Sequence, residues 1–326
     1  MAIPGFVDLQ ANGCMSVDYS SLSLTKDDFI TSCRALKAKG TIAFLPTIIT
    51  ASEEVYEQNL AIFLSAMKSD EEVNEMVLGF HLEGPFLSAV DGARGAHPKN
   101  YIQKPSIPFL KKLIAWSDNN IKLITIAAEL DGSKELCEFA TKQGITVSLG
   151  HQLATYEQIS ELHKAGAKGL THLGNANPHL VDRHKNALMA GLASNELYAM
   201  MITDGFHIPD EFIKLVLLTR GTKRSFIVSD ASPHAGMPEG YYSTLGLNLH
   251  LNKSGKLYNI ETDNLVGSSF TMLECLNYMA SLNLVSEQGL EKLGFYNSLS
   301  FLGIDTNHIS TKPLITFSDN KYSLIG

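Results

Sequence analysis

Polar side chains that can bind metals or move protons follow four apolar stretches of the sequence, at the point where each stretch ends. Glu83 stands in HLEGPF, His151 in SLGHQ, His172 in THLGNANP and Asp230 in VSDASPHAG. One carboxylate and two imidazoles are a known ligand set for a catalytic zinc ion, with a fourth position left for water. We therefore treat Glu83, His151 and His172 as candidate metal ligands. A second carboxylate, Asp230, remains free to handle protons.

The elements that must position these residues form a regular alternation. Strand-like apolar runs are followed by stretches with helical apolar spacing and a glycine at or near their ends. The runs are 3–10, 41–48, 76–83, 121–128, 145–150, 168–173, 198–203 and 225–230. Strands that alternate with helices predict right-handed βαβ units and a parallel sheet. Eight of them predict an α/β fold of the closed (β/α)8 TIM-barrel type, with a doubly wound open sheet as the alternative. In a barrel all strand carboxyl ends open on one face, so the four polar side chains can meet there.

Two segments break the alternation. Residues 241–264 alternate apolar and polar positions around NKSGK, which is typical of a β-hairpin, and the tail 306–326 shows a similar pattern. We expect these two segments to pack together as a small β-structure, a reduced β-sandwich. The barrel then comprises residues 1–240 and 265–305.

Composition limits the classes of function. The chain has 326 residues, of which 44% are hydrophobic and 18% charged, and a formal net charge of −8. This balance suits a globular enzyme and disfavours nucleic acid or an anionic membrane as partner. No apolar run is long enough for a membrane span, and the start of the chain lacks the shape of a signal peptide. The four cysteines, Cys14, Cys33, Cys137 and Cys275, are scattered, so we expect a cytoplasmic protein without disulfides.

Each candidate residue also has an ordinary interpretation. A histidine after a strand is often a hydrogen-bonded loop residue, and Asp230 could cap a following turn. His163, His250 and His308 receive no role. No glycine-rich nucleotide-binding motif is present.

Seven motifs in order resemble those of the N-acetylglucosamine-6-phosphate deacetylase family, a branch of the amidohydrolase superfamily. The similarity runs from about Pro4 to about Leu276. The motifs are PGFVDLQANG, HLEGPF with GAHP, GHQLATYEQ, THLGNANP, TDGFHIP, SDASPHAGMPEG and VGSSFTM.

The resemblance implies a role for each matching residue. Glu83, His151 and His172 would bind one divalent metal ion, expected to be Zn²⁺, and Asp230 would be the general base and then the general acid. His97 would lie near the acyl carbonyl. Arg183 would bind the phosphate of a substrate held by the neighbouring subunit, which implies a homodimer. The other substrate contacts would be Ala96, Asn175, Ala176, His207, Leu265, Val266 and Gly267.

The implied reaction is removal of the acetyl group from N-acetylglucosamine 6-phosphate, a small-molecule substrate. A related N-acyl amino sugar, such as N-acetylgalactosamine 6-phosphate, or an N-acyl amino acid would fit the same chemistry. A non-catalytic sugar-phosphate binding protein is the alternative from another class, and an intact carboxylate at position 230 speaks against it.

The sequence departs from the family pattern at several places. Many amidohydrolases carry H-x-H at the end of the first strand, and we assign that place here to Asp8-Leu9-Gln10. Gln152, Gly174 and Asn177 also differ from the usual residues near the pocket. Relatives usually have a longer segment before the first strand that forms half of a β-sandwich, so we expect that sandwich to be reduced.

Overall fold

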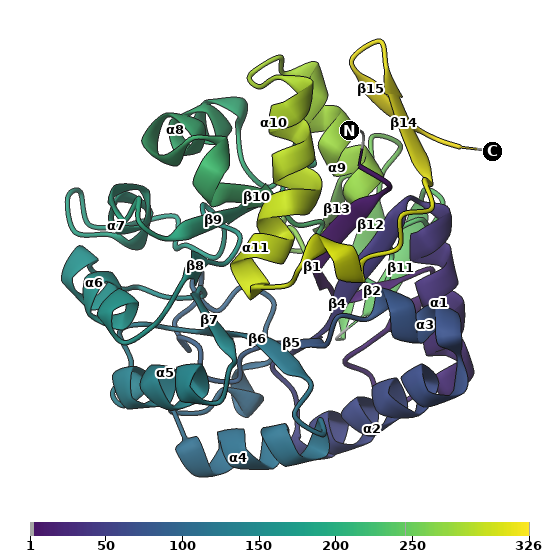
Figure 1. The fold of residues 1–326 in the computed structure, drawn as a ribbon. Coiled ribbons are helices and arrows are strands. Elements are labelled where there is room, and N and C mark those ends of the chain that lie inside the picture. Colours follow the sequence, from purple (N-terminus) through teal and green to yellow (C-terminus); the bar gives the residue numbers. More distant parts are fainter. Residues whose placement is uncertain (1–2, 245, 326) are drawn as a thin grey trace.

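The chain folds into a barrel of parallel strands enclosed by helices (Figure 1). The computed structural model describes residues 3–244 and 246–325. Eight strands pair in the order β1-β4-β5-β6-β7-β8-β9-β10, and every pair in that order is parallel. Their bounds are β1 Phe6–Ala11, β4 Thr41–Ile49, β5 Phe80–Glu83, β6 Ile121–Ile126, β7 Thr146–Leu149, β8 Gly169–Leu170, β9 Tyr198–Met201 and β10 Ser225–Ile227. These strands confirm the predicted TIM-type barrel, and the doubly wound alternative is wrong.

Helices connect the strands and cover the outside of the barrel (Figure 1). Most begin at a side chain that accepts a hydrogen bond from a free backbone N–H of the first turn, such as Ser52 and Ser106. At the start of α6, Thr155 and Gln158 form a reciprocal capping box. The helices are α1 Lys26–Ala38, α2 Glu53–Ser69, α3 Glu71–Met76, α4 Ile107–Trp116, α5 Ser133–Lys142, α6 Tyr156–Lys164, α7 Ala187–Ala193, α8 Asp210–Arg220, α9 Met272–Ser281, α10 Glu287–Glu291 and α11 Asn297–Leu302. None of the described helices is both long and apolar enough to cross a membrane.

The barrel closes at a seam between the end of β1 and the residues that follow β10. Ala11 forms an isolated parallel bridge with Ala231, and the backbone N–H of Asn12 donates to the Ala231 carbonyl at 2.7 Å. Below this bridge the buried carboxylate of Asp8 accepts hydrogen bonds from the hydroxyl and the backbone N–H of Ser229. The seam holds the end of β1 beside Asp230.

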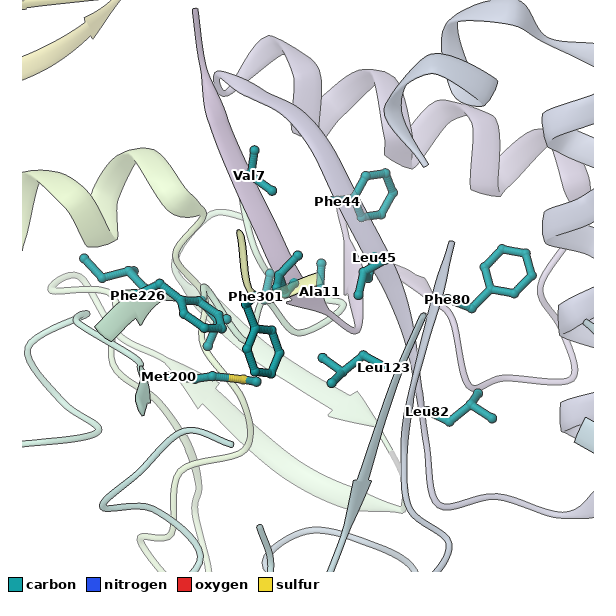
Figure 2. Close-up of a cluster of buried hydrophobic side chains, with 14 of the residues drawn as sticks. Val7, Ala11, Phe44, Leu45, Phe80, Leu82, Leu123, Met200, Phe226 and Phe301 are labelled. Carbon is teal, nitrogen blue, oxygen red and sulfur yellow. The ribbon is translucent and has the colours of Figure 1, made fainter. Parts of the chain in front are cut away.

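A continuous apolar core fills the barrel and the layer under the helices. Figure 2 shows Val7, Leu45, Leu123, Met200 and Phe301 among its members, and all are buried. Phe301 of α11 lies so close to β8 that a Cβ at Gly169 would approach its ring to 2.8 Å. A side chain at position 169 would therefore displace this aromatic ring, which lowers the stability of the core.

Three small antiparallel sheets accompany the barrel in the described part of the chain. Strands β11 Gly240–Thr244, β12 Leu247–Leu251 and β13 Leu257–Asn259 form an antiparallel sheet, and β14 Ile315–Ser318 pairs with β15 Lys321–Leu324. A further short pair, β2 Gly13–Cys14 and β3 Val17–Asp18, follows β1.

The β11–β13 sheet and the tail hairpin are separate units, contrary to the joined β-structure that the sequence suggested. The hydrophobic residues of the β11–β13 sheet pack with Ala96 and Met237, in loops that follow barrel strands. The tail instead packs at the beginning of β1, where Tyr322 contacts the ring of Phe6 and the N–H of Leu314 donates to the Pro4 carbonyl. The physical reason is that each segment buries its apolar face against a different end of the barrel.

Candidate metal centre

Glu83, His151 and His172 converge at the carboxyl ends of β5, β7 and β8. Oε1 of Glu83 lies 2.8 Å from Nε2 of His172 and 3.3 Å from Nε2 of His151, and the two Nε2 atoms are 3.1 Å apart. All three residues are buried. The barrel therefore brings together side chains separated by as many as 89 positions in the sequence.

This cluster fits a metal ion by its donor chemistry. Zinc–nitrogen and zinc–oxygen bonds of about 2.0–2.1 Å at tetrahedral angles place neighbouring ligand atoms roughly 3.3 Å apart. The observed separations of 2.8, 3.1 and 3.3 Å are close to that value. Burial opposes ionisation of Glu83, but its contacts with the imidazole rings of His151, His172 and His97 outweigh it and hold the pKa of this carboxyl well below its usual range. Glu83 is thus an anion at neutral pH, as a metal ligand must be.

A third histidine, His97, belongs to the loop after β5 and also faces Glu83. Its Nε2 lies 3.5 Å from Oε2 of Glu83, and the ligand atoms of Glu83, His97 and His151 lie within 4.8 Å of one another. Two overlapping triads therefore share Glu83 and His151. They differ in whether His172 or His97 is the third member.

Hydrogen bonds at the far side of each ring distinguish His151 from His97. Nδ1 of His151 lies 2.9 Å from the carbonyl oxygen of Ala93, which can only accept, so Nδ1 carries the proton and Nε2 has the free lone pair. Nδ1 of His97 accepts from the backbone N–H of Thr50 at 3.3 Å. In the neutral ring Nε2 of His97 then carries the proton. His151 is oriented as a metal ligand and His97 as a hydrogen-bond donor.

The protonation state of His97 agrees with this assignment. Burial and the nearby charge of His151 lower the pKa of His97 to about 4, although Glu83 acts in the opposite direction. The ring is therefore neutral at physiological pH. Because a neutral His97 has one N–H, and that proton is on Nε2, it points toward the metal ligands. The triad with His172 therefore remains the candidate metal site.

Asp230, which follows β10, is held beside this centre by two amides from the end of β1. Nε2 of Gln10 donates to Oδ1 of Asp230 at 3.0 Å and to Oε1 of Glu83 at 2.9 Å. Nδ2 of Asn12 donates to the same Oδ1 at 2.7 Å. Burial and the charge of Glu83 raise the pKa of Asp230, while His172, His207 and Asn12 lower it. A carboxyl whose proton affinity is raised is suited to take up and return a proton.

Several of these side chains are carried on unusual backbone conformations. His151, His172 and Asp230 have positive φ angles of 50°, 31° and 49°. Residues other than glycine adopt such angles rarely, and they do so mostly where the surrounding structure holds them. The end of each strand thus turns sharply and presents its side chain to the centre.

Gln10 and Asn12 were not identified as a pair from the sequence. The place of the H-x-H motif was assigned to Asp8-Leu9-Gln10, and this assignment is wrong for Asp8, whose carboxylate faces Ser229 at the seam. The physical reason is the two-residue period of a strand, which directs Asp8, Gln10 and Asn12 to one face at successive depths. The alternation of polar residues in DLQAN was a signal that could have located the two amides at the mouth.

The predicted sugar contacts Asn175 and Ala176 lie in the loop after β8. Nδ2 of Asn175 donates to the carbonyl oxygen of His172 at 3.1 Å, and Ala176 has a φ of 54°. Both line a cavity of about 20 Å³ next to His151, which has room for one water molecule. His207 follows β9, and its Nδ1 lies 2.7 Å from Oδ2 of Asp204.

The segment Leu265–Gly267 runs beside the loop that carries Asp230. Val266 is buried with Ala96 packed against its cluster, whereas Leu265 is half-buried. Gly267 has a φ of 63°, and a Cβ there would lie 3.3 Å from the Asp230 carbonyl oxygen. This close approach favours glycine.

Arg183 is the predicted site residue that the barrel does not bring to the centre. It is exposed in the loop between β8 and α7, next to Leu180 and Val181, whose exposed fractions are 92% and 42%. Among the described residues of a single chain, Arg183 is therefore not placed to bind the phosphate of a substrate held at the candidate site of the same chain.

Comparisons with known proteins agree on one group. A model of the amidohydrolase family matches residues 1–311. N-acetylglucosamine-6-phosphate deacetylase of Lysinibacillus sphaericus is 30% identical over 91% of this chain and 75% of its own length. The enzyme of the same name from Caenorhabditis elegans is 31% identical over 85% of this chain and 68% of its own. The crystal structure of N-acetylglucosamine-6-phosphate deacetylase from Pasteurella multocida, 26% identical, covers 99% of this chain and 86% of that one, with a TM-score of 0.83.

Proposed function

The chain belongs to the amidohydrolase family, and from that membership we propose that it hydrolyses N-acetylglucosamine 6-phosphate to glucosamine 6-phosphate and acetate. Two lines of support come from different sources. Relatives that are about 30% identical over most of the chain carry this activity in their names. The observation that carries the proposal is the position of Asp230, which is joined through the Gln10 amide to Glu83 of the candidate metal centre.

The candidate ligands of a single divalent ion, for which we propose Zn²⁺, are Glu83, His151 and His172. The ion would supply Lewis acidity, which activates water and polarises an acyl carbonyl. The protein orients the ligands: Ala93 fixes the tautomer of His151, and the Gln10 amide holds Glu83. Such supporting contacts normally affect metal affinity as well as geometry.

Asp230 moves the proton in this mechanism. Its carboxylate takes a proton from the attacking water as the water oxygen forms a bond to the acyl carbon. The same proton then passes to the amide nitrogen as the C–N bond breaks, so that acetate and a free amine leave. Asn12 and Gln10 hold Oδ1 of Asp230 at 2.7 and 3.0 Å, which leaves Oδ2 for the transferred proton. Positioned proton transfer of this kind accelerates reactions by roughly 10²–10⁴-fold.

In this mechanism His97 donates a hydrogen bond to the acyl oxygen of the substrate. Negative charge develops on this oxygen during attack, and the Nε2–H of His97 is aimed at the same side of the centre as Glu83. Thr50 keeps that proton on Nε2 by occupying Nδ1. A preorganised donor of this kind typically contributes about 10²–10³-fold to turnover.

The substrate pocket, in this proposal, is completed by a second copy of the chain. Asn175, Ala176 and His207 line the sugar side, and Ala96 with Leu265–Gly267 lines the acyl side. Arg183 of the partner subunit binds the 6-phosphate, because its planar guanidinium suits phosphate oxygens. The exposed Leu180 and Val181 beside Arg183 support burial of this loop in a homodimer.

We also propose that the enzyme works in the cytoplasm. Its four cysteines are all buried and free. Free thiols of this kind persist in reducing compartments.

Acetate release from a panel of N-acetylated compounds tests the activity. Purified protein is assayed with N-acetylglucosamine 6-phosphate, N-acetylgalactosamine 6-phosphate, unphosphorylated N-acetylglucosamine and an N-acetyl amino acid, before and after chelation and with Zn²⁺ restored. We expect the first substrate to have the highest kcat/KM, and chelation to abolish it reversibly. A higher kcat/KM for another compound of the panel would identify that compound as the substrate. Binding of N-acetylglucosamine 6-phosphate without acetate release would indicate a non-catalytic protein.

A further inference from the structure

The carboxylate of Asp204 lies outside the metal centre and is saturated with hydrogen bonds. Oδ1 accepts from the backbone N–H groups of Phe206 and His207 at 2.9 and 3.0 Å. Oδ2 accepts from Nδ1 of His207 at 2.7 Å and from the hydroxyl of Ser268 at 3.0 Å. The residue is 3% exposed. The two oxygens thus have different tasks, since one forms a backbone turn and the other holds two side chains.

Through Oδ2, Asp204 joins two segments that come from different parts of the sequence. His207 belongs to the loop after β9, whereas Ser268 follows the proposed substrate contacts Leu265–Gly267. Ser268 also donates its backbone N–H to the carbonyl oxygen of Asp230 at 2.9 Å. A single carboxylate therefore fixes the His207 ring relative to the loop that carries the general base.

The contact with the Asp204 carboxylate determines how the His207 ring faces a ligand. Burial opposes ionisation of Asp204, but the charge of His207 and the hydrogen bonds from its ring and the backbone outweigh it and lower the pKa of the carboxyl. Because Oδ2 of Asp204 accepts, Nδ1 of His207 carries a proton and the ring is held in one orientation. Nε2 makes no hydrogen bond within the described part of the chain, so it remains free to face a phosphate group.

We propose that Asp204 is a positioning residue that holds the ring of His207 so that Nε2 meets the phosphate of the substrate. This inference rests on the proposed function, because it takes a sugar phosphate as the ligand. Asp204 itself would not touch the substrate. Its effect should therefore appear in the affinity for phosphorylated ligands, and only through His207.

The variant Asp204→Asn isolates this role. The amide oxygen of asparagine can still accept the two backbone N–H groups and so retains the turn. The NH2 group of the asparagine, however, faces the N–H on Nδ1 of His207, so that two donors meet. The negative charge of the Asp204 carboxylate is also lost. If Asp204 were needed only for the turn, this variant would behave like the wild type. Asp305→Asn, which changes a carboxylate that accepts from the N–H of Asn307, is the matched control.

The experiment combines binding and kinetics in a double-mutant cycle of Asp204→Asn with His207→Gln. Calorimetry measures the Kd for glucosamine 6-phosphate, and acetate release gives kcat and KM for phosphorylated and unphosphorylated N-acetylglucosamine. We expect Asp204→Asn to weaken sugar-phosphate binding by about tenfold or more, the size of one charge-assisted hydrogen bond. Values for the unphosphorylated sugar should change little. In the His207→Gln background the Asp204 change should add almost nothing.

The outcomes separate the two proposals. An unchanged Kd in Asp204→Asn, or a full effect that persists without His207, overturns the positioning role and leaves the deacetylase intact. Sugar-phosphate binding that depends on Asp204 without any acetate release overturns the deacetylase and supports the positioning role. A wild-type protein that neither binds glucosamine 6-phosphate nor releases acetate overturns both.

Discussion

The side-chain amide of Gln10 lies between the carboxylates of Glu83 and Asp230, with Nε2 2.9 Å from Oε1 of the first and 3.0 Å from Oδ1 of the second. Both partners can only accept, so the nitrogen end of the amide must face them. The two N–H groups screen the repulsion between a candidate metal ligand and the candidate base. One neutral side chain thus allows two negative charges to share the mouth of the barrel.

Replacing this amide by a carboxylate tests its screening role. Gln10→Glu would place a third acid between Glu83 and Asp230, which raises the proton affinity of the group and removes two donated hydrogen bonds. We expect kcat/KM to fall by about 10²-fold, equivalent to the loss of about 3 kcal/mol. The exposed Gln288→Glu makes the same chemical change on α10 and should leave kcat/KM unaltered. Wild-type activity in Gln10→Glu would show that the amide does not matter.

Asp230→Asn removes the proposed base and keeps the size of the side chain. We expect normal folding, retained metal and a loss of turnover of about 10²–10⁴-fold or more, because asparagine cannot accept the water proton. Thermal unfolding and metal content report on the first two points, and acetate release reports on the third. Hydrolysis close to the wild-type rate would exclude Asp230 from the mechanism.

His97 and His172 should fail in different ways when each is replaced by glutamine. His172→Gln removes a metal ligand, so the protein should lose most of its metal on dialysis. His97→Gln removes only a donor to the acyl oxygen, so metal content should stay at one ion per chain while kcat falls by about 10²–10³-fold. Metal analysis beside kcat distinguishes them. Loss of metal from His97→Gln would assign His97, and not His172, to the metal.

Asp8 should make stability depend on pH. Burial, opposed by hydrogen bonds from Ser229, raises the pKa of its carboxyl from 3.8 to about 7. The folded state therefore keeps a proton that the unfolded state has lost, so the free energy of unfolding should fall as pH rises from about 4 to about 7. The loss is up to about 4 kcal/mol, at 1.36 kcal/mol for each unit of pKa shift.

The variant Asp8→Asn isolates that contribution. Urea denaturation at several pH values gives the free energy of unfolding of the wild type and of Asp8→Asn. The value for the wild type, relative to that for Asp8→Asn, should fall between pH 4 and 7 and stay constant above pH 7. A difference that does not vary over this range would mean that the carboxyl titrates as in the unfolded chain.

The barrel and the meeting of the three candidate metal ligands could be predicted from the sequence because both depend on local patterns. Apolar runs marked the strands, and strand ends in this fold necessarily share one face, so Glu83, His151 and His172 could be located without coordinates. The expected strand 76–83 was observed as Phe80–Glu83, and each of the other expected strands overlaps an observed one, although some, such as Gly169–Leu170 within 168–173, are shorter.

The orientation of the imidazoles could not be predicted, because it depends on contacts across the sequence. The proton of His151 is fixed by Ala93, 58 positions away, and that of His97 by Thr50, 47 positions away. Nothing in the residues around either histidine specifies such partners. The same limit applied to Gln10, whose two carboxylate partners are 73 and 220 positions distant.

The left-handed backbone at His151, His172 and Asp230 implies a conflict between durability and chemistry. Each such residue costs of order 1–3 kcal/mol that a more relaxed strand end would not require. Selection for heat resistance alone would favour glycine at these three positions, which would remove the two imidazoles and the carboxylate. The mouth of this barrel is therefore where we expect gains in robustness to be incompatible with turnover, and where thermostable variants of the chain should leave the sequence untouched.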